Sequence, residues 1–134
     1  MVLASAQQVR AESIVVVVNN KAPVQQLTSD EVKAIYLGEQ NYWGQTKIHP
    51  VSYRSARGVQ SDFLRQVVQI TPPNFAKYWI RRIFREGGIP PKKANSQIEL
   101  LRTIASQDGA IGFLFAADLP ANPTSLRTVY RSTD

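Results

Sequence analysis

Two guanidinium groups, two hydroxyls and a glycine gather in one short stretch of the chain. They are Arg54, Ser55, Arg57, Gly58 and Ser61. Guanidinium groups and hydroxyls donate hydrogen bonds to oxyanions, and backbone amides at the start of a helix add further donors. This combination indicates a binding site for phosphate or a similar oxyanion. A helix capped by Ser55, with both arginines in solvent, is an alternative of equal weight.

The elements on either side of this stretch would aim its donors in one direction. Residues 48–53 are predicted to form a strand, residues 54–58 a tight loop and residues 59–70 a helix. Apolar side chains recur after the loop at the spacing of one buried helix face. The first amides of such a helix have no partner within it, and the positive end of the helix dipole lies behind them. An oxyanion is therefore expected at the start of this helix.

The residues that most enzymes and metal sites need are scarce. There is no cysteine, and His49, which precedes Pro50, is the only histidine. Disulfides, thiolate metal sites and cysteine nucleophiles are excluded, and neither a histidine metal cluster nor a histidine-based nucleophile pair can be assembled. The sequence also lacks a nucleophile elbow, a phosphate-cradling lysine loop and a dinucleotide fingerprint. We therefore expect a protein that is not an enzyme and has no catalytic residues, metal or cofactor.

The composition is that of a basic globular domain. The 134 residues are 43% hydrophobic, and 16 Lys and Arg outnumber 10 Asp and Glu, for a formal net charge of +6. This balance favours anionic partners: a small oxyanion, nucleic acid or an anionic membrane surface. Nucleic acid is the weakest candidate, because the arginines of residues 72–85 cluster in the last turns of a predicted helix, where cations offset the dipole. The longest apolar run, residues 14–18, is too short to span a bilayer, so no transmembrane segment is expected.

Strand and helix patterns alternate along the chain. Four valines after Ile14 are typical of a strand covered on both faces, and Thr28 with Glu31 forms the pattern of a helix capping box. The predicted strands are residues 13–19, 48–53, 110–115 and 126–131, and the predicted helices are residues 28–37, 59–70, 72–85 and one that starts at residue 95 or 96. This order predicts an α/β fold with helices on both faces of the sheet, in a strand order that the sequence leaves open.

The spacing of apolar residues in two predicted helices indicates which side chains face the core. In the third helix they are Phe75, Tyr78, Trp79, Ile83 and Phe84, and in the fourth they are Ile98, Leu101, Ile104 and Ala105. The stretch from residue 39 to residue 47 is predicted to be a polar loop whose aromatic pair, Tyr42 and Trp43, covers the edge of the core.

The first residues are expected to stand apart from the fold. Residues 1–12 resemble the end of a secretory signal, because Ala11 is small and Val9 precedes it by two positions. A disordered tail is the alternative. We favour a truncated signal peptide and therefore expect an exported, periplasmic protein, with one α/β domain over residues 13–131.

A series of short motifs, each present once, extends in a fixed order over nearly the whole chain. They are residues 17–19, 27–32, 35–38, Trp43, residues 48–51, Phe63, residues 78–79 and residues 109–113. As an ordered series they resemble the phosphate-binding proteins of ABC transporters, within the type 2 periplasmic binding protein superfamily. Those proteins have two lobes that close on phosphate, and this chain resembles a short, single-lobe member.

The resemblance implies a function and a set of partners. It implies a non-enzymatic, solute-binding-like protein of the cell envelope, with a single lobe whose mixed sheet has helices on both faces. Arg54 matches the arginine of the family's anion loop, whereas the aspartate and the Gly-Ser-Gly-Thr core of that loop have no counterpart here. Phosphate or a similar oxyanion, and a partner protein or second copy covering the open face, are the implied partners. The alternative is a protein–protein interaction scaffold that has kept the lobe without its ligand.

Overall fold

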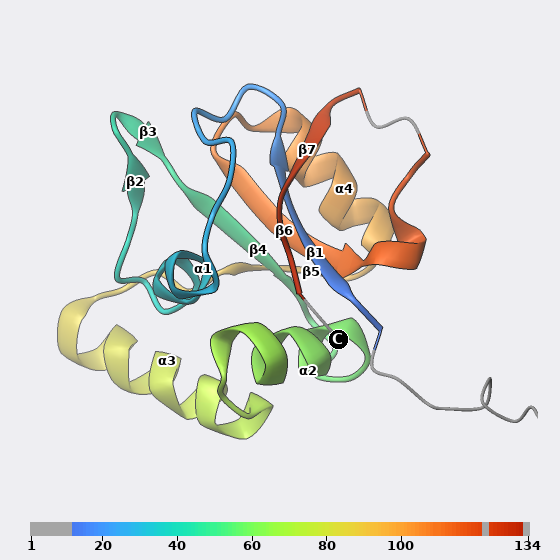
Figure 1. The fold of residues 1–134 in the computed structure, drawn as a ribbon. Coiled ribbons are helices and arrows are strands. Elements are labelled where there is room, and N and C mark those ends of the chain that lie inside the picture. The colour runs from blue at the N-terminus through green and yellow to red at the C-terminus, as the bar shows by residue number, and fades with distance from the viewer. Residues whose placement is uncertain (1–11, 122–123, 133–134) are drawn as a thin grey trace, which may run out of the picture.

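The structure is a computed structural model that describes residues 12–121 and 124–132. A five-stranded sheet crosses the middle of the molecule, and helices cover both of its faces (Figure 1). The predicted α/β class and the mixed sheet are confirmed. The predicted signal remnant lies, except for Glu12, outside the described residues.

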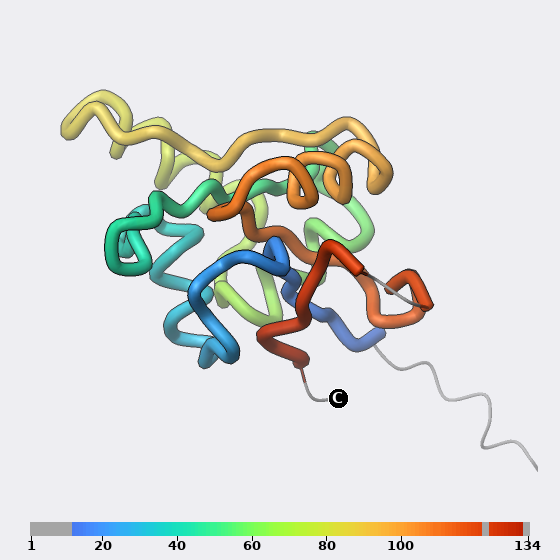
Figure 2. The backbone as a smooth tube through the Cα atoms, turned by 90° about the horizontal axis from the view of Figure 1, so that it is seen from above, coloured from blue at the N-terminus to red at the C-terminus, as the bar shows by residue number. Residues whose placement is uncertain are grey.

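The sheet combines parallel and antiparallel pairs. Its strands are β1 (Ile14–Asn19), β4 (His49–Tyr53), β5 (Lys92–Ala94), β6 (Ala110–Phe115) and β7 (Leu126–Arg131). In space they follow the order β5-β4-β6-β1-β7. β4 is parallel to β5 and β6, whereas β1 is antiparallel to β6 and β7. The first and last strands of the chain therefore lie side by side, on the far side of the sheet from β5 (Figure 2).

Helices divide into two groups, one on each face of the sheet. They are α1 (Ser29–Tyr36), α2 (Val59–Phe63), α3 (Pro72–Glu86) and α4 (Gln97–Ser106), with the π-helical turn η2 (Leu64–Val68) directly after α2. The alternating side chains of β1 face the two groups in turn, as the valine run predicted. Val16 and Val18 belong to the core with α1, α2, η2 and α3, while Val15 and Val17 belong to the core with α4.

Capping side chains fix the start of α1, as predicted, and also the start of α3. Thr28 Oγ1 accepts a hydrogen bond from the Glu31 amide at 3.1 Å, and Glu31 Oε1 accepts one from the Thr28 amide at 2.8 Å. Thr71 Oγ1 accepts a hydrogen bond from the Asn74 amide at 3.3 Å and opens α3. These bonds satisfy amides that the first helical turn leaves unpaired.

Side chains of α3 bind the carbonyl groups at the end of α1. The three pairs are Trp79 Nε1 to the Tyr36 carbonyl at 3.1 Å, Tyr78 Oη to the Leu37 carbonyl at 2.6 Å, and Arg82 Nη2 to the Gly38 carbonyl at 3.0 Å. The last carbonyls of a helix need such partners, because no amide follows them within the helix. α1 and α3 are therefore joined by hydrogen bonds as well as by packing.

The helix predicted over residues 59–70 has a different form. Five residues of α-helix, α2, pass into the π-helical turn η2, and Gln69 ends the segment in the left-handed region at a φ of 65°. The apolar face is as predicted, since Phe63, Leu64 and Val67 are buried. The prediction was therefore right about which residues are buried and wrong about the helix type, because the second half is a π-helix.

Several side chains that were predicted to face the core are exposed. Ile83 and Phe84 of α3 lie outside, and so do Ile98 and Ala105 of α4. Phe84 follows the buried Phe75 by nine residues, which at roughly 3.6 residues per turn places it on the opposite side of the helix. The prediction for these residues was wrong because it counted apolar side chains over an arc wider than one face.

Two short elements were not predicted. Residues 39–47 contain a small hairpin of β2 (Tyr42–Trp43) and β3 (Thr46–Lys47) in place of a simple loop, and β5 follows the Gly-Pro stretch after α3. Of the aromatic pair only Trp43 is buried, while Tyr42 is exposed. Tyr42 is therefore no part of the predicted cover over the core.

Candidate anion-binding site

The predicted anion loop lies where two parallel strands end. β4 leads into residues 54–58 and then into α2, while its neighbour β5 leads into Asn95 and Ser96 and then into α4 (Figure 1). Both helices therefore begin at the carboxyl edge of the sheet. This edge is the usual position for ligands in α/β folds.

Arg54 joins the two loops. Its amide donates a hydrogen bond to the Ala94 carbonyl at 2.8 Å, and its Nε donates one to Asn95 Oδ1 at 2.7 Å. The side chain is exposed, and the guanidinium group keeps further N–H groups for a ligand. Arg54 thus holds the edge together and also faces solvent there.

The start of α2 has amides without partners. Gly58 adopts a φ of 62° and a ψ of −130° and provides no side-chain cap. The first amide to bond back to the loop is that of Asp62, which donates to the Gly58 carbonyl at 3.0 Å. Among the described residues, the amides of residues 59–61 have no hydrogen-bond acceptor. They are the free donors that the sequence predicted at this position.

The start of α4 differs, because the chain caps it. Ser96 Oγ accepts a hydrogen bond from the Glu99 amide, and Glu99 Oε1 accepts one from the Asn95 amide, both at 3.1 Å. A carboxylate thus already occupies the position where an anion would bind. Of the two helix starts at this edge, only that of α2 has no side-chain cap.

The remaining predicted residues hold the loop or point into solvent. Ser55 Oγ accepts a hydrogen bond from the Arg57 amide at 3.2 Å, which shapes the turn but leaves α2 uncapped. Ser61 Oγ accepts one from Arg65 Nε at 3.2 Å, so that the hydroxyl hydrogen of Ser61 stays available. The Arg57 side chain is exposed and makes no ion pair with any described residue. The alternative prediction was wrong in its cap, because Ser55 does not cap α2, but both arginines are exposed as it expected.

Two side chains that the sequence did not single out support the loop from below. Gln60 is buried, and its Oε1 accepts a hydrogen bond from the Tyr53 amide at 2.8 Å. Tyr53 Oη donates to the Phe113 carbonyl at 3.0 Å. Burial, with a smaller effect from the negative charge of Asp118, raises the pKa of Tyr53 to about 12. Tyr53 therefore remains a neutral hydrogen-bond donor at ordinary pH.

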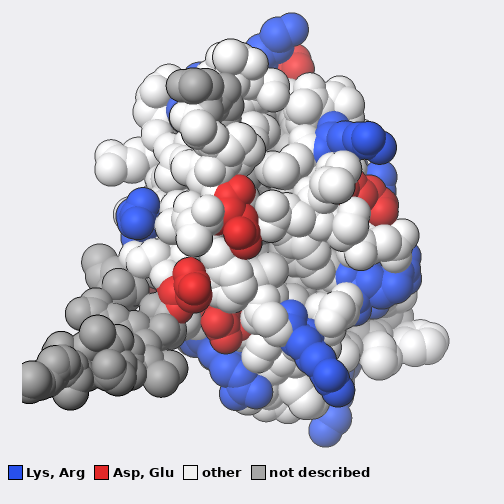
Figure 3. Space-filling view, turned by 90° about the vertical axis from the view of Figure 1, so that its right-hand side faces the viewer, with Lys and Arg blue, Asp and Glu red and all other residues white. Residues whose placement is uncertain are grey.

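The charge on this side of the molecule is mixed. Figure 3 shows this side, with Lys and Arg gathered along the right and lower margins and Asp and Glu in a strip through the middle. Cations and carboxylates therefore both lie on this side of the molecule. Because the charges are mixed, an anion here would be held by individual hydrogen-bond donors more than by the electrostatic field of the whole surface.

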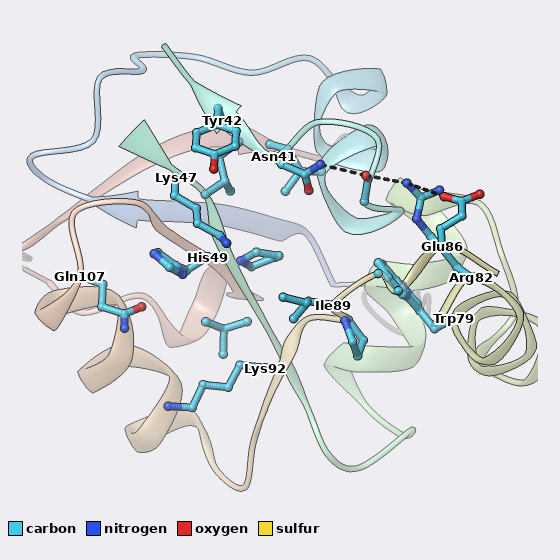
Figure 4. A pocket seen from close by; sticks show the side chains of 18 residues that line it. Asn41, Tyr42, Lys47, His49, Trp79, Arg82, Glu86, Ile89, Lys92 and Gln107 are labelled. Carbon is cyan, nitrogen blue, oxygen red and sulfur yellow. Dashed lines mark hydrogen bonds and ion pairs between the residues drawn. The ribbon is translucent and has the colours of Figure 1, made fainter. Parts of the chain in front are cut away.

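A further cavity lies elsewhere in the molecule. It has a volume of about 690 Å³ and is lined by the amino ends of β4 and β5, the hairpin and the end of α3. Figure 4 shows Lys47, His49, Gln107 and Lys92 on one side of it and Trp79, Arg82 and Glu86 on the other. It opens at the end of β4 opposite to Arg54. We favour the loop for an anion, because the cavity has cationic side chains but no free helix amides.

Comparison with solved structures identifies the fold. A phosphate ABC transporter substrate-binding protein of Clostridium perfringens, with bound phosphate, matches with a TM-score of 0.67 and 18% identity over 90% of this chain and 46% of that one. An ABC-type phosphate transport receptor from Vibrio cholerae matches with a TM-score of 0.66 and 17% identity over 96% of this chain and 52% of that one. This chain has the fold of one lobe of a type 2 periplasmic binding protein. PstS from Borrelia burgdorferi matches with a TM-score of 0.59 and 17% identity over 78% of this chain and 41% of that one.

The Vibrio cholerae and Clostridium perfringens matches cover 90% or more of this chain but only about half of each relative. No protein-family model matches the chain, and no curated protein matches it. The lobe fold is thus shown by structure alone, and these relatives are non-enzymatic binding proteins. No described helix has the length and apolar character needed to cross a membrane.

Proposed function

We propose that this chain binds phosphate or a similar oxyanion at residues 54–61. The observation that supports this most is the open start of α2, where the amides of residues 59–61 have no described acceptor. Arg54 and Arg57 precede these amides in the same loop and offer exposed, charged donors. A structural relative from Clostridium perfringens has phosphate bound, which supports the choice of ligand.

We further propose that a partner protein or a second copy of this chain completes the site. The loop is exposed, so that water screens each guanidinium pair, and such contacts are worth about 1 kcal/mol or less. The lobe by itself would then bind phosphate only at about millimolar concentration. A partner protein or a second copy over this edge would exclude water and strengthen the same contacts. An exported protein in the periplasm would meet both ligand and partner there.

Isothermal titration with phosphate tests the proposal. For the unchanged chain we expect saturable heat with a dissociation constant of about 1 mM. Arg57→Gln should weaken binding about threefold to tenfold, because it removes a charged donor that supports no other contact. Circular dichroism should show the same fold as in the unchanged chain.

Two control variants define the site. Arg102→Gln removes an exposed cation from α4 and should leave phosphate binding unchanged. Lys47→Gln with Lys92→Gln removes charge from the large cavity and should also leave it unchanged. Absence of heat with the unchanged chain, or a loss confined to the cavity variant, would disprove binding at residues 54–61.

The second candidate is an interaction scaffold that has kept the lobe without its ligand. The observation in its favour is that Arg54 already donates to Asn95, so that one of the two predicted anion-binding arginines has a structural role. The titration described above separates the two candidates, since a scaffold would give no phosphate-dependent heat.

A further inference from the structure

Exposed apolar side chains are concentrated at one end of α3 and the segment after it. They are Ile80 at 57% exposure, Ile83 at 41%, Phe84 at 86% and Ile89 at 77%. In the rest of the described chain, Tyr42 and Ile98 are the only other large apolar side chains that are exposed. Single exposed apolar residues are ordinary, whereas a group on one surface marks an interaction site. Ile80 and Phe84 form such a group because they line one hollow, whereas Ile89 lines the cavity beside Trp79.

Three cations lie beside these apolar side chains. Lys77, Arg81 and Arg85 follow one another at intervals of four, and with Ile80 and Phe84 they line a shallow hollow. Residues four apart share one side of a helix, so that a cationic strip and an apolar strip run next to each other. None of the three cations forms an ion pair with a described residue. The neighbouring carboxylate of Glu86 pairs with Arg82 instead.

The opposite side of α3 fixes the helix to the molecule. Phe75 and Trp79 are buried, and Tyr78, Trp79 and Arg82 donate to the last carbonyls of α1. Figure 1 shows α3 at the lower margin of the molecule, below the sheet. The two strips are therefore held on a rigid outer surface and need no unfolding to meet a partner.

Charge and shape together define the partner. A second copy would bring Lys77, Arg81 and Arg85 against the same cations, which disfavours a symmetric pair. The partner should therefore be anionic. Phe84, at 86% exposure, projects outward and lines only a shallow hollow with Ile80, so a soft host that needs no preformed pocket fits these side chains better than a rigid protein surface. A basic, amphipathic helix surface of this kind is typical of proteins that lie on a bilayer.

We propose that the outer face of α3 docks on an anionic phospholipid membrane surface. Phe84 and Ile80 enter the headgroup region, and Lys77, Arg81 and Arg85 lie at the level of the lipid phosphates. This surface is separate from residues 54–61, so the inference stands independently of oxyanion binding by the loop.

Vesicle binding tests this inference with the full chain. Vesicles of phosphatidylcholine with about 30% phosphatidylglycerol should bind the protein at low salt, and pure phosphatidylcholine should bind it about tenfold or more weakly. Phe84→Ala should reduce binding about tenfold, because a projecting aromatic ring is lost. Arg81→Gln with Arg85→Gln should reduce it by a similar factor and weaken its dependence on salt.

Matched controls come from α4 and from the ligand. Ile98→Ala and Arg102→Gln remove an exposed apolar residue and an exposed cation from another helix, and each should change vesicle binding less than twofold. Millimolar inorganic phosphate at constant ionic strength should not release the protein, since the contact is a surface and not a headgroup pocket. The inference is overturned if the mixed vesicles fail to bind the chain, if Phe84→Ala binds as well as the unchanged chain, or if the α4 variants lose as much.

Discussion

At the scale of single residues, Gly38 is the position where backbone and core constrain the sequence together. It follows α1 with a φ of 76°, a value that favours glycine. A Cβ atom there would lie 2.7 Å from Trp79 Cη2, within the packed contact between α1 and α3. Both the turn and the indole ring therefore exclude a side chain.

Gly38→Ala should lower the free energy of unfolding by about 2–3 kcal/mol, because backbone strain adds to overpacking. Gly44→Ala is the matched control. Its φ of 62° carries a similar backbone cost, but nothing lies within 4 Å of the added carbon, so we expect a loss of about 1 kcal/mol. Urea unfolding followed by tryptophan fluorescence measures both. Equal losses would show that the contact with Trp79 carries no cost.

Residue types in the sequence singled out residues 54–61 as the candidate anion site, but not the residues that surround it. Arg54, Arg57 and Gly58 follow a strand within a few positions, and such local order is readable. Asn95, which binds Arg54, is forty-one positions away, and only the pairing of β4 with β5 brings the two together. The signal missed at Gln60 was local: a polar side chain on an otherwise apolar helix face.

At the scale of elements, capping decides where helices begin. Thr28 and Glu31 bind each other's amides at the start of α1, and their spacing made the start of this helix predictable. Elements without such signals were missed or altered: the hairpin, β5 and the π-helical turn η2 are short, and their shape depends on packing more than on local residues. The outward turn of Phe84 was missed because α3 carries more apolar residues than its buried side can hold.

Thr28→Ala should destabilise the protein by about 1 kcal/mol, since it removes the cap of α1 and half of the capping box. The adjacent Ser29→Ala is the control: Ser29 is exposed and takes part in neither bond, so we expect a change within about 0.5 kcal/mol. Thermal or urea unfolding compares the two. A loss as large for Ser29→Ala would mean that the capping box is not the source of the effect.

At the scale of the whole molecule, β1 joins two cores. Its alternating side chains enter the clusters on both faces of the sheet, and its neighbours β6 and β7 come from the far end of the chain. The sequence predicted a strand buried on both faces, but not this strand order, because long-range pairing leaves no local trace in the residues. The shared strand should make the two cores unfold together.

Val17→Ala tests this coupling. Val17 is fully buried in the core with α4, whereas Trp43 and Trp79 lie in the core on the other face. We expect a loss of about 2 kcal/mol, with equal shifts in the unfolding midpoints measured by tryptophan fluorescence and by far-ultraviolet circular dichroism. A shift in circular dichroism without one in fluorescence would show that the two faces unfold separately.

The hydrogen bonds from α3 to the end of α1 decide how this lobe can be shortened. Tyr78, Trp79 and Arg82 are side-chain partners of three backbone carbonyls, and among the described residues only the Gly38 carbonyl has a second side-chain donor, Asn41 Nδ2 at 3.2 Å. Deletion of α3 would therefore leave the carbonyl groups of Tyr36 and Leu37 without their hydrogen-bond donors beside the core, and the remaining lobe would have to rearrange or aggregate. Any smaller version of this lobe that folds must supply those donors from a different segment.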